Sequence, residues 1–130
     1  MVHLGHDATM RKQNPKIIEV LFYKTPGGKE PVREWMLQLD KDDRYIMGVD
    51  LKTVEFGWPL GMPLVRSMKS HDGLWEVRSN ISGNSIARVL FTVHGARMVL
   101  LHGFVKKTQK TPKSDLDLAD DRMREVNRGN

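Results

Sequence analysis

The segment from Pro63 to Lys113 concentrates side chains that could bind and cleave a phosphodiester. It contains nine basic residues and only two acidic ones, within a chain whose net charge is +5. The basic residues are Arg66, Lys69, Arg78, Arg88, Arg97, Lys106, Lys107, Lys110 and Lys113. Clustered basic side chains attract polyanions, so the segment predicts a nucleic acid or an acidic protein as partner. A merely solvated basic face is the alternative that composition leaves open.

The alternation of the strand-like run LWEVR brings charged side chains to one face. Leu74, Glu76 and Arg78 share this face, because successive residues of a strand point to opposite sides. The next run carries Arg88 between apolar neighbours. A charge in apolar surroundings needs a partner, a ligand or water. Arg88 therefore either binds a ligand or forms a salt bridge with Glu76, and both interpretations stay open.

Five strands are predicted to position these side chains. The first has many β-branched and aromatic residues, and the other four alternate with a period of two. These runs are 17–24, 64–69, 74–81, 85–93 and 96–104. The last four are joined by the short connections HDG, SGN and HG, which require antiparallel neighbours. An N-terminal strand and a four-stranded antiparallel meander are therefore expected.

Helical periodicity precedes and follows the meander. Apolar residues at i, i+3, i+4 and i+7 from Val32 predict a helix that begins at Pro31, and Asp40 is placed to cap a second helix. Ser114 is the expected cap of a last helix. The order strand, helix, helix, four strands, helix predicts an α+β fold with helices packed on one face of a twisted antiparallel sheet. Trp35 and Trp58 are expected in its core.

Length and composition limit the class of protein. A chain of 130 residues with 39% hydrophobic residues predicts one domain, which we place at residues 17–130. Residues 1–16 show no period and predict a mobile N-terminal tail. The absence of cysteine excludes disulfides and thiolate chemistry. No apolar run approaches the ~20 residues that span a bilayer, so a soluble, cytoplasmic protein without membrane contact is expected.

The order of three runs resembles the RelE/HigB superfamily of bacterial toxins, especially its phage-derived and HigB branch. These runs are KSHDGLWEVR, RVLF and LLHGFVKKTQKTP, and an amphipathic helix follows them. The resemblance covers residues 17–126 and is strongest in 69–112. It implies a RelE/ParE-like fold and an endoribonuclease that enters the ribosomal A site and cuts translated messenger RNA. In that family the messenger's own 2′-hydroxyl attacks the adjacent phosphate, without metal or cofactor.

The resemblance also implies roles for the basic residues. Arg88 matches the arginine that follows a hairpin turn and holds the scissile phosphate. Arg78 matches a basic residue at the end of the preceding strand, and Lys69 matches the lysine before the GLWE element. Lys107, with Lys106 beside it, stands where relatives place a basic side chain that stabilises charge in the transition state.

The resemblance leaves more than one candidate for each group that would transfer a proton. Some relatives have a His or Tyr near the C-terminus as general acid, whereas this chain ends VNRGN. The leaving 5′-oxygen would then be protonated by a lysine, by water or by His102, since histidine suits proton transfer near neutral pH. Glu76 is the candidate general base, and orienting Arg78 or Arg88 is its alternative role. Lys106, Lys110 and Phe104 are the expected substrate-binding residues.

A toxin of this kind needs partners and has competing interpretations. We expect the ribosomal A site and messenger RNA as targets, and a helix-turn-helix antitoxin of the HigA kind as inhibitor. The antitoxin would lie across the basic face or against the helices in 31–58. One alternative is a ParE-like inhibitor of DNA gyrase without nuclease activity. Another is an RNA-binding regulator without toxicity.

Overall fold

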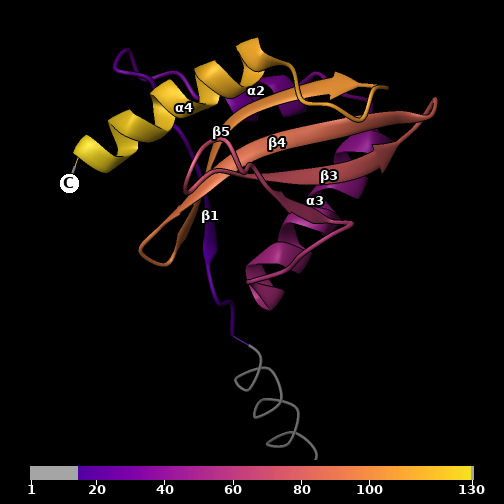
Figure 1. Ribbon diagram of the computed structural model, residues 1–130. Coiled ribbons are helices and arrows are strands. Elements are labelled where there is room, and N and C mark those ends of the chain that lie inside the picture. Colours follow the sequence, from indigo (N-terminus) through magenta and orange to yellow (C-terminus); the bar gives the residue numbers. More distant parts are fainter. Residues whose placement is uncertain (1–14, 130) are drawn as a thin grey trace, which may run out of the picture.

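A five-stranded sheet forms the centre of the computed structural model, which describes residues 15–129 (Figure 1). Its strands lie in the order β1-β5-β4-β3-β2. They are β1 (Glu19–Phe22), β2 (Val65–Ser67), β3 (Trp75–Ile81), β4 (Ser85–His94) and β5 (Arg97–Lys106). Strands β2 to β5 pair with their neighbours in antiparallel fashion, which confirms the predicted meander.

Strand β1 corrects the expectation of a purely antiparallel sheet. It pairs with β5 in parallel, from Glu19 opposite Arg97 to Phe22 opposite Leu100. The sheet is therefore mixed, because the predicted N-terminal strand joins the four strands of the meander as a parallel fifth strand. The physical reason is that β5 ends the meander with a row of backbone groups that need partners, and β1 supplies them.

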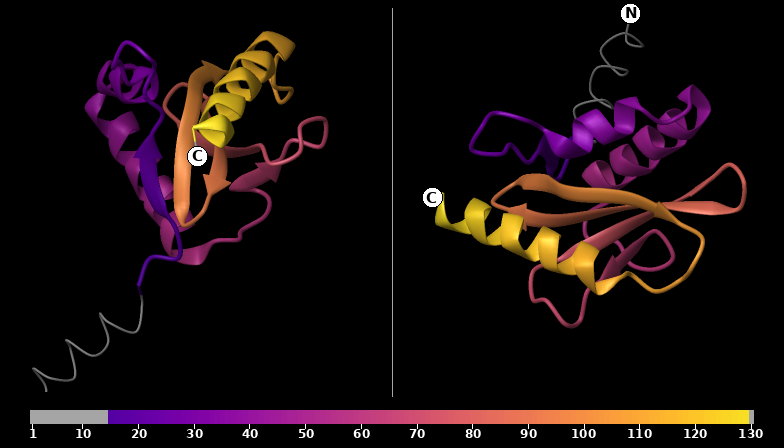
Figure 2. Two further views of the ribbon diagram at one scale, coloured as in Figure 1. Left: turned by 90° about the vertical axis from the view of Figure 1, so that its left-hand side faces the viewer. Right: turned by 90° about the horizontal axis from the view of Figure 1, so that it is seen from above.

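Helices cover both faces of the sheet, so the expectation of one covered face is wrong. Figure 2 shows α2 (Pro31–Leu37) and α3 (Lys41–Gly57) on one side and α4 (Lys113–Arg128) on the other. The central strands are apolar on both faces: Phe91 belongs to the core beneath α2 and α3, whereas Leu90 belongs to the core beneath α4. A sheet with two apolar faces needs cover on both.

The predicted helix starts are close to the observed ones. Helix α2 begins at Pro31, and Asp40 is the N-cap residue of α3, although its side chain makes no capping hydrogen bond. Helix α4 begins at Lys113, so the start predicted from Ser114 is wrong by a small margin. Pro112 occupies the N-cap position instead, with φ −62°. The predicted apolar face of α4 packs against the sheet.

A glycine in β5 allows α2 to lie close to the sheet. A Cβ atom built on Gly103 would lie 2.3 Å from Cζ3 of Trp35, so only a residue without a side chain fits there. Trp35 and Trp58 both pack against the core, as predicted. The ring of Trp58 meets Trp75 edge-on, with centroids 5.1 Å apart.

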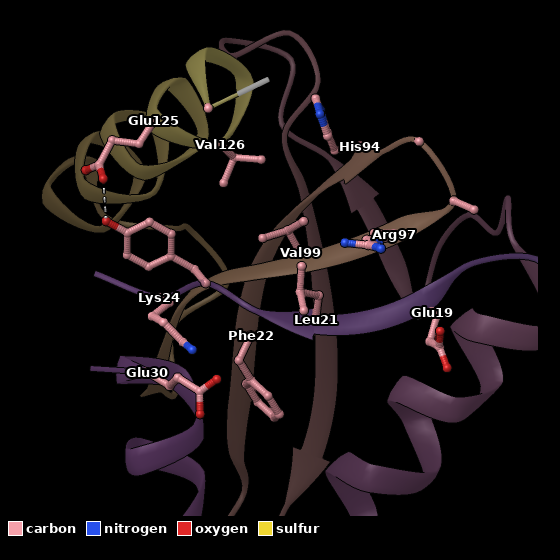
Figure 3. A pocket seen from close by; sticks show the side chains of 14 residues that line it. Glu19, Leu21, Phe22, Lys24, Glu30, His94, Arg97, Val99, Glu125 and Val126 are labelled. Carbon is pink, nitrogen blue, oxygen red and sulfur yellow. Dashed lines mark hydrogen bonds between the residues drawn. The ribbon is translucent and has the colours of Figure 1, made fainter. Parts of the chain in front are cut away.

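A pocket of about 800 Å³ lies beside β1, between that strand, the turn from β4 to β5 and the last turns of α4 (Figure 3). Across its wall Tyr23 Oη donates a hydrogen bond of 2.9 Å to Glu125 Oε1. Arg122 lies over the Tyr23 ring, 5.2 Å from its centroid. Burial, followed by the hydrogen bond to Glu125, raises the pKa of the Tyr23 hydroxyl. This contact ties the C-terminal helix to the sheet edge.

Replacing Tyr23 by phenylalanine is expected to lower the free energy of unfolding by about 0.5–1.5 kcal/mol at neutral pH, because one hydrogen bond is lost. A raised folded-state pKa stabilises the wild type below the ordinary pKa of 10.0, and this contribution disappears as pH rises through the raised value. The difference between the two proteins should therefore shrink in alkaline solution. Urea denaturation at neutral and alkaline pH measures it, and a difference that grows with pH would contradict the assignment.

No helix within residues 15–129 has the length and apolar character needed to cross a membrane. The mobile tail predicted for residues 1–16 lies outside the described residues, apart from Pro15 and Lys16. The Lys16 ammonium is 3.3 Å from a carboxylate oxygen of Glu55 on α3.

Candidate functional site

Four charged side chains of the meander lie on the sheet face that carries α4. Arg66 of β2 is directly opposite Glu76 of β3, and Arg78 of β3 is directly opposite Arg88 of β4. Directly opposed residues share a face, and Glu76 and Arg78 are two positions apart on one strand. The predicted grouping of Glu76, Arg78 and Arg88 is therefore present, and Arg66 joins it.

Glu76 and Arg88 form a buried ion pair. Both side chains are 0% exposed, and Arg88 Nη1 lies 3.6 Å from Glu76 Oε1. Arg78 Nε lies 3.8 Å from the same oxygen. The salt bridge that the sequence left open therefore exists. Within residues 15–129, the buried atoms Glu76 Oε1 and Arg88 Nε have no hydrogen-bond partner.

Three arginines and one carboxylate make up this group of four side chains, and the excess positive charge affects the pKa of Arg88. Burial lowers the pKa of the Arg88 guanidinium, and Glu76 opposes this effect. The charges of Arg78 and Arg66 lower the pKa further. Three guanidinium groups thus act on one another around the carboxylate of Glu76. An additional anion would reduce the repulsion between them.

The segment 107–111, which we call the strap, covers Arg88. Arg88 Nη1 donates a 2.7 Å hydrogen bond to the carbonyl oxygen of Gln109, and Nη2 donates to that of Thr108. Two polar side chains of the strap add further bonds. Arg78 Nη2 donates to Gln109 Oε1 at 2.5 Å, and Thr111 Oγ1 donates to Glu76 Oε2 at 2.5 Å. Neutral oxygens of the strap therefore accept hydrogen bonds from the guanidinium groups of Arg78 and Arg88.

An open cleft of about 620 Å³ adjoins the strap. Three cationic side chains line it, and they are Arg66, Lys69 and Lys110. All three residues are exposed. The structure thus brings together Lys69 and Lys110, which the sequence assigned to a catalytic and a substrate-binding role.

The remaining predicted residues lie around this region. Lys106 ends β5 and Lys107 begins the strap, and both are exposed. His102 Nε2 is 2.6 Å from Asp115 Oδ1 at the start of α4. Phe104 is only 8% exposed and its ring stacks on His102, with centroids 5.6 Å apart. The structure therefore places Phe104 in the core and His102 beside the first turn of α4.

Sequence reasoning gave no role to several residues of this region. Arg66 appears in the predicted basic segment, but nothing marked it as facing Glu76 until the register of β2 was known. Nothing in the sequence indicated that Asp115 contacts His102. Thr108 and Gln109 use backbone carbonyl oxygens toward Arg88, and a sequence carries no pattern for such contacts.

The arrangement can bind a phosphate or another small anion through several positive charges and hydroxyl groups. Within residues 15–129 there is no group of three or more His, Asp or Glu side chains placed to hold a metal ion. Among families of known proteins, the model for the phage-derived protein Gp49-like (DUF891) matches residues 34–124. That match includes the whole meander, all of α3 and most of α4. A search of curated proteins finds no match.

Proposed function

The chain belongs to the family of phage-derived Gp49-like proteins, which is toxin-like, and from this premise we propose that it is the toxin of a toxin–antitoxin pair. Its activity, in this proposal, is that of a ribosome-dependent endoribonuclease of the RelE/HigB kind that cuts translated messenger RNA. The observation that supports it best is the placement of Arg78 and Arg88 beside the buried carboxylate of Glu76.

The proposed reaction is an intramolecular transfer at phosphorus. The 2′-oxygen of the messenger loses its proton and forms a bond to the adjacent phosphorus, while the bond from phosphorus to the 5′-oxygen breaks and that oxygen gains a proton. Negative charge grows on the phosphate oxygens during this step. Arg88 and Arg78 would stabilise that charge, and preorganised donors of this type contribute about 10²–10³-fold each. Within residues 15–129 the buried Nε of Arg88 donates to no protein group.

The strap has to move for this chemistry. Arg88 donates to carbonyl oxygens of Thr108 and Gln109, and those oxygens occupy the positions where phosphate oxygens would bind. The hydroxyl of Thr111 likewise donates a hydrogen bond to the carboxylate of Glu76. We therefore propose that the ribosome-bound messenger replaces the strap carbonyls. Glu76 orients two arginines while the strap is closed, and it can accept a proton from the 2′-hydroxyl only after Thr111 withdraws.

Two candidates remain for the proton that the 5′-oxygen receives from the protein. His102 is held by Asp115 at 2.6 Å, which fixes the ring and leaves Nδ1 for other contacts. Lys107 is exposed at the start of the strap. A mobile lysine beside the substrate and an oriented histidine are both chemically competent acids.

The burial of Arg88 and Glu76 favours a second candidate function, inhibition of DNA gyrase in the manner of ParE. A pair that is 0% exposed on both sides can be purely structural, and a ParE-like inhibitor of DNA gyrase needs no phosphate-binding arginine. In that function the same fold would bind gyrase and would cleave no RNA. The experiment below separates the two proposals.

The antitoxin is part of the proposal, and the outer surface of α3 suits it better than the basic face. Tyr45, Val49 and Phe56 are 73%, 45% and 42% exposed, and their spacing places them on one side of the helix. An exposed apolar stripe on a helix is the kind of surface that an amphipathic partner helix covers. Growth measured while the toxin is co-expressed with its antitoxin tests this proposal. A Tyr45→Ser variant whose toxicity the antitoxin still fully suppresses would oppose it.

Induction of the wild-type chain in bacteria is expected to stop growth and to produce new messenger 5′ ends inside translated reading frames. Arg78→Gln and Lys107→Gln should each reduce cleavage by about 10²-fold or more, because a group that stabilises charge is lost. Primer extension with and without a block of translation initiation measures the ends. Lys52→Gln, an exposed lysine of α3 on the opposite face, is the matched control.

Two outcomes would contradict this proposal in different ways. Growth arrest with intact messengers and broken DNA would move the assignment to gyrase. Cleavage that persists when translation is blocked would reject ribosome dependence.

A further inference from the structure

The cleft beside the strap is more positive than the buried pair next to it. Its cations Arg66, Lys69 and Lys110 come from two segments that are distant in sequence. Within residues 15–129, no carboxylate lies within ion-pair distance of any of the three. Three cations that line one cleft and form no ion pair repel one another, and an anion bound between them reduces that repulsion.

The other lining residues indicate which anion fits. Ser67 and Ser70 add hydroxyl groups, which bind phosphate oxygens well, whereas the Thr111 hydroxyl donates to Glu76. Met62 and Leu116 supply apolar surface, and Met62 is 62% exposed. A phosphate that carries a sugar and a base uses both kinds of surface, whereas a free inorganic anion uses only the first.

The cleft is close to the proposed reaction centre. Arg66 lies opposite Glu76, and its charge lowers the pKa of Arg88. Thr111 lines the cleft and also donates to Glu76. A strand of RNA with one phosphate at Arg88 therefore has a neighbouring cationic site within the same face of the sheet.

We propose that this cleft is a second phosphate-binding subsite, which holds the phosphodiester next to the scissile one in single-stranded RNA. The inference rests on the proposed function, because that function places the scissile phosphate at Arg88. Arg66 and Lys69, which lie outside the strap, bind the neighbouring phosphate, and Lys110 adds its charge from the displaced strap. The apolar wall at Met62 and Leu116 contacts the nucleoside of that phosphate. The subsite sets the register of the strand and does not take part in the chemical step.

Binding of a 2′-O-methyl RNA oligonucleotide of about eight nucleotides tests this, since such a strand cannot be cleaved by its own 2′-oxygen. Fluorescence anisotropy with the purified full chain is measured between about 50 and 200 mM salt. Arg66→Met and Lys110→Met should each weaken binding about tenfold. Each should also lower the slope of log affinity against log salt by about 0.7, the value for one phosphate contact on a single strand.

Matched controls remove the same charge elsewhere. Arg33→Met on α2 controls for Arg66→Met, and Lys52→Met on α3 controls for Lys110→Met, because both helices lie on the opposite face of the sheet. The controls should bind like the wild type. Cleft variants whose salt slopes equal those of the controls would overturn the subsite, and so would a wild-type chain that does not bind the strand.

Failure of the subsite and failure of the nuclease give different results. If the subsite is wrong, Arg66→Met binds the oligonucleotide and cuts messengers as the Arg33→Met control does. If only the nuclease is wrong, no messenger is cut by any variant, yet binding of the blocked strand still depends on Arg66 and Lys110.

Discussion

Replacing Arg88 by methionine is expected to destabilise the fold by about 3 kcal/mol, because the buried carboxylate of Glu76 loses its buried counter-charge and keeps only Arg78, 3.8 Å away. The same change should abolish growth arrest, because it removes the proposed phosphate-binding guanidinium. Loss of activity in this variant alone would be ambiguous, since an unfolded chain is also inactive. A second substitution separates the two effects.

Adding Glu76→Gln to Arg88→Met removes both charges and retains an oxygen that can accept the hydrogen bond from Thr111. The double variant should regain most of the lost stability, because a neutral pair carries no uncompensated buried charge. It should nevertheless remain inactive. Urea denaturation gives the stability, and messenger 5′-end mapping gives the activity, with Arg33→Met as a control for loss of an exposed arginine. A double variant that folds and still cuts messengers would remove Arg88 from the proposed reaction.

Replacing Gly103 by alanine is expected to cost about 3 kcal/mol or more of folding free energy. The added Cβ would lie 2.3 Å from Cζ3 and 2.4 Å from Cε3 of Trp35, and the indole of Trp35 is packed against the core. Overpacking of this kind forces side chains and backbone to shift. The change should therefore separate α2 from β5, the strand that leads into the strap.

The free energy of unfolding from urea titration measures this cost, with two comparisons built into the chain. Gly48→Ala on α3 has no atom within 4 Å of the added Cβ, and should stabilise the helix by up to about 1 kcal/mol. Trp35→Leu in the Gly103→Ala background should recover part of the loss, because the smaller side chain makes room. An alanine at Gly103 that leaves stability unchanged would mean that Trp35 moves aside at little cost.

The meander was predictable because its information is local. The strands around Glu76 and Arg88 alternate with a clear period, and short turns leave their neighbours only one relative direction. The pairing of β1 with β5 joins residues far apart in sequence, such as Glu19 and Arg97, and no local pattern specifies it. Alternation also could not show that apolar side chains on both faces of β4 require helices on both sides.

The candidate site was predictable to the extent that side chains of one strand define it. Glu76 and Arg78 share a face by their spacing, and Arg88 was expected to join them in the meander. The cover over Arg88 depends on backbone oxygens of the strap, which any residue type supplies. Arg66 was missed as a site residue because its strand, β2, has only three residues and shows too little alternation to indicate a face.

The parallel partner of β1 also sets the order in which the chain can fold during its own synthesis. Glu19 pairs with Arg97, which leaves the ribosome 78 residues later, so β1 and the helices that follow it emerge before their sheet exists. Long-range pairing of this kind delays folding until the last partner is available. The oxygens that bind Arg88 come later still, at Thr108 and Gln109. A nascent chain therefore has neither the complete sheet nor the cover over Arg88 until residues 97–109 have been made.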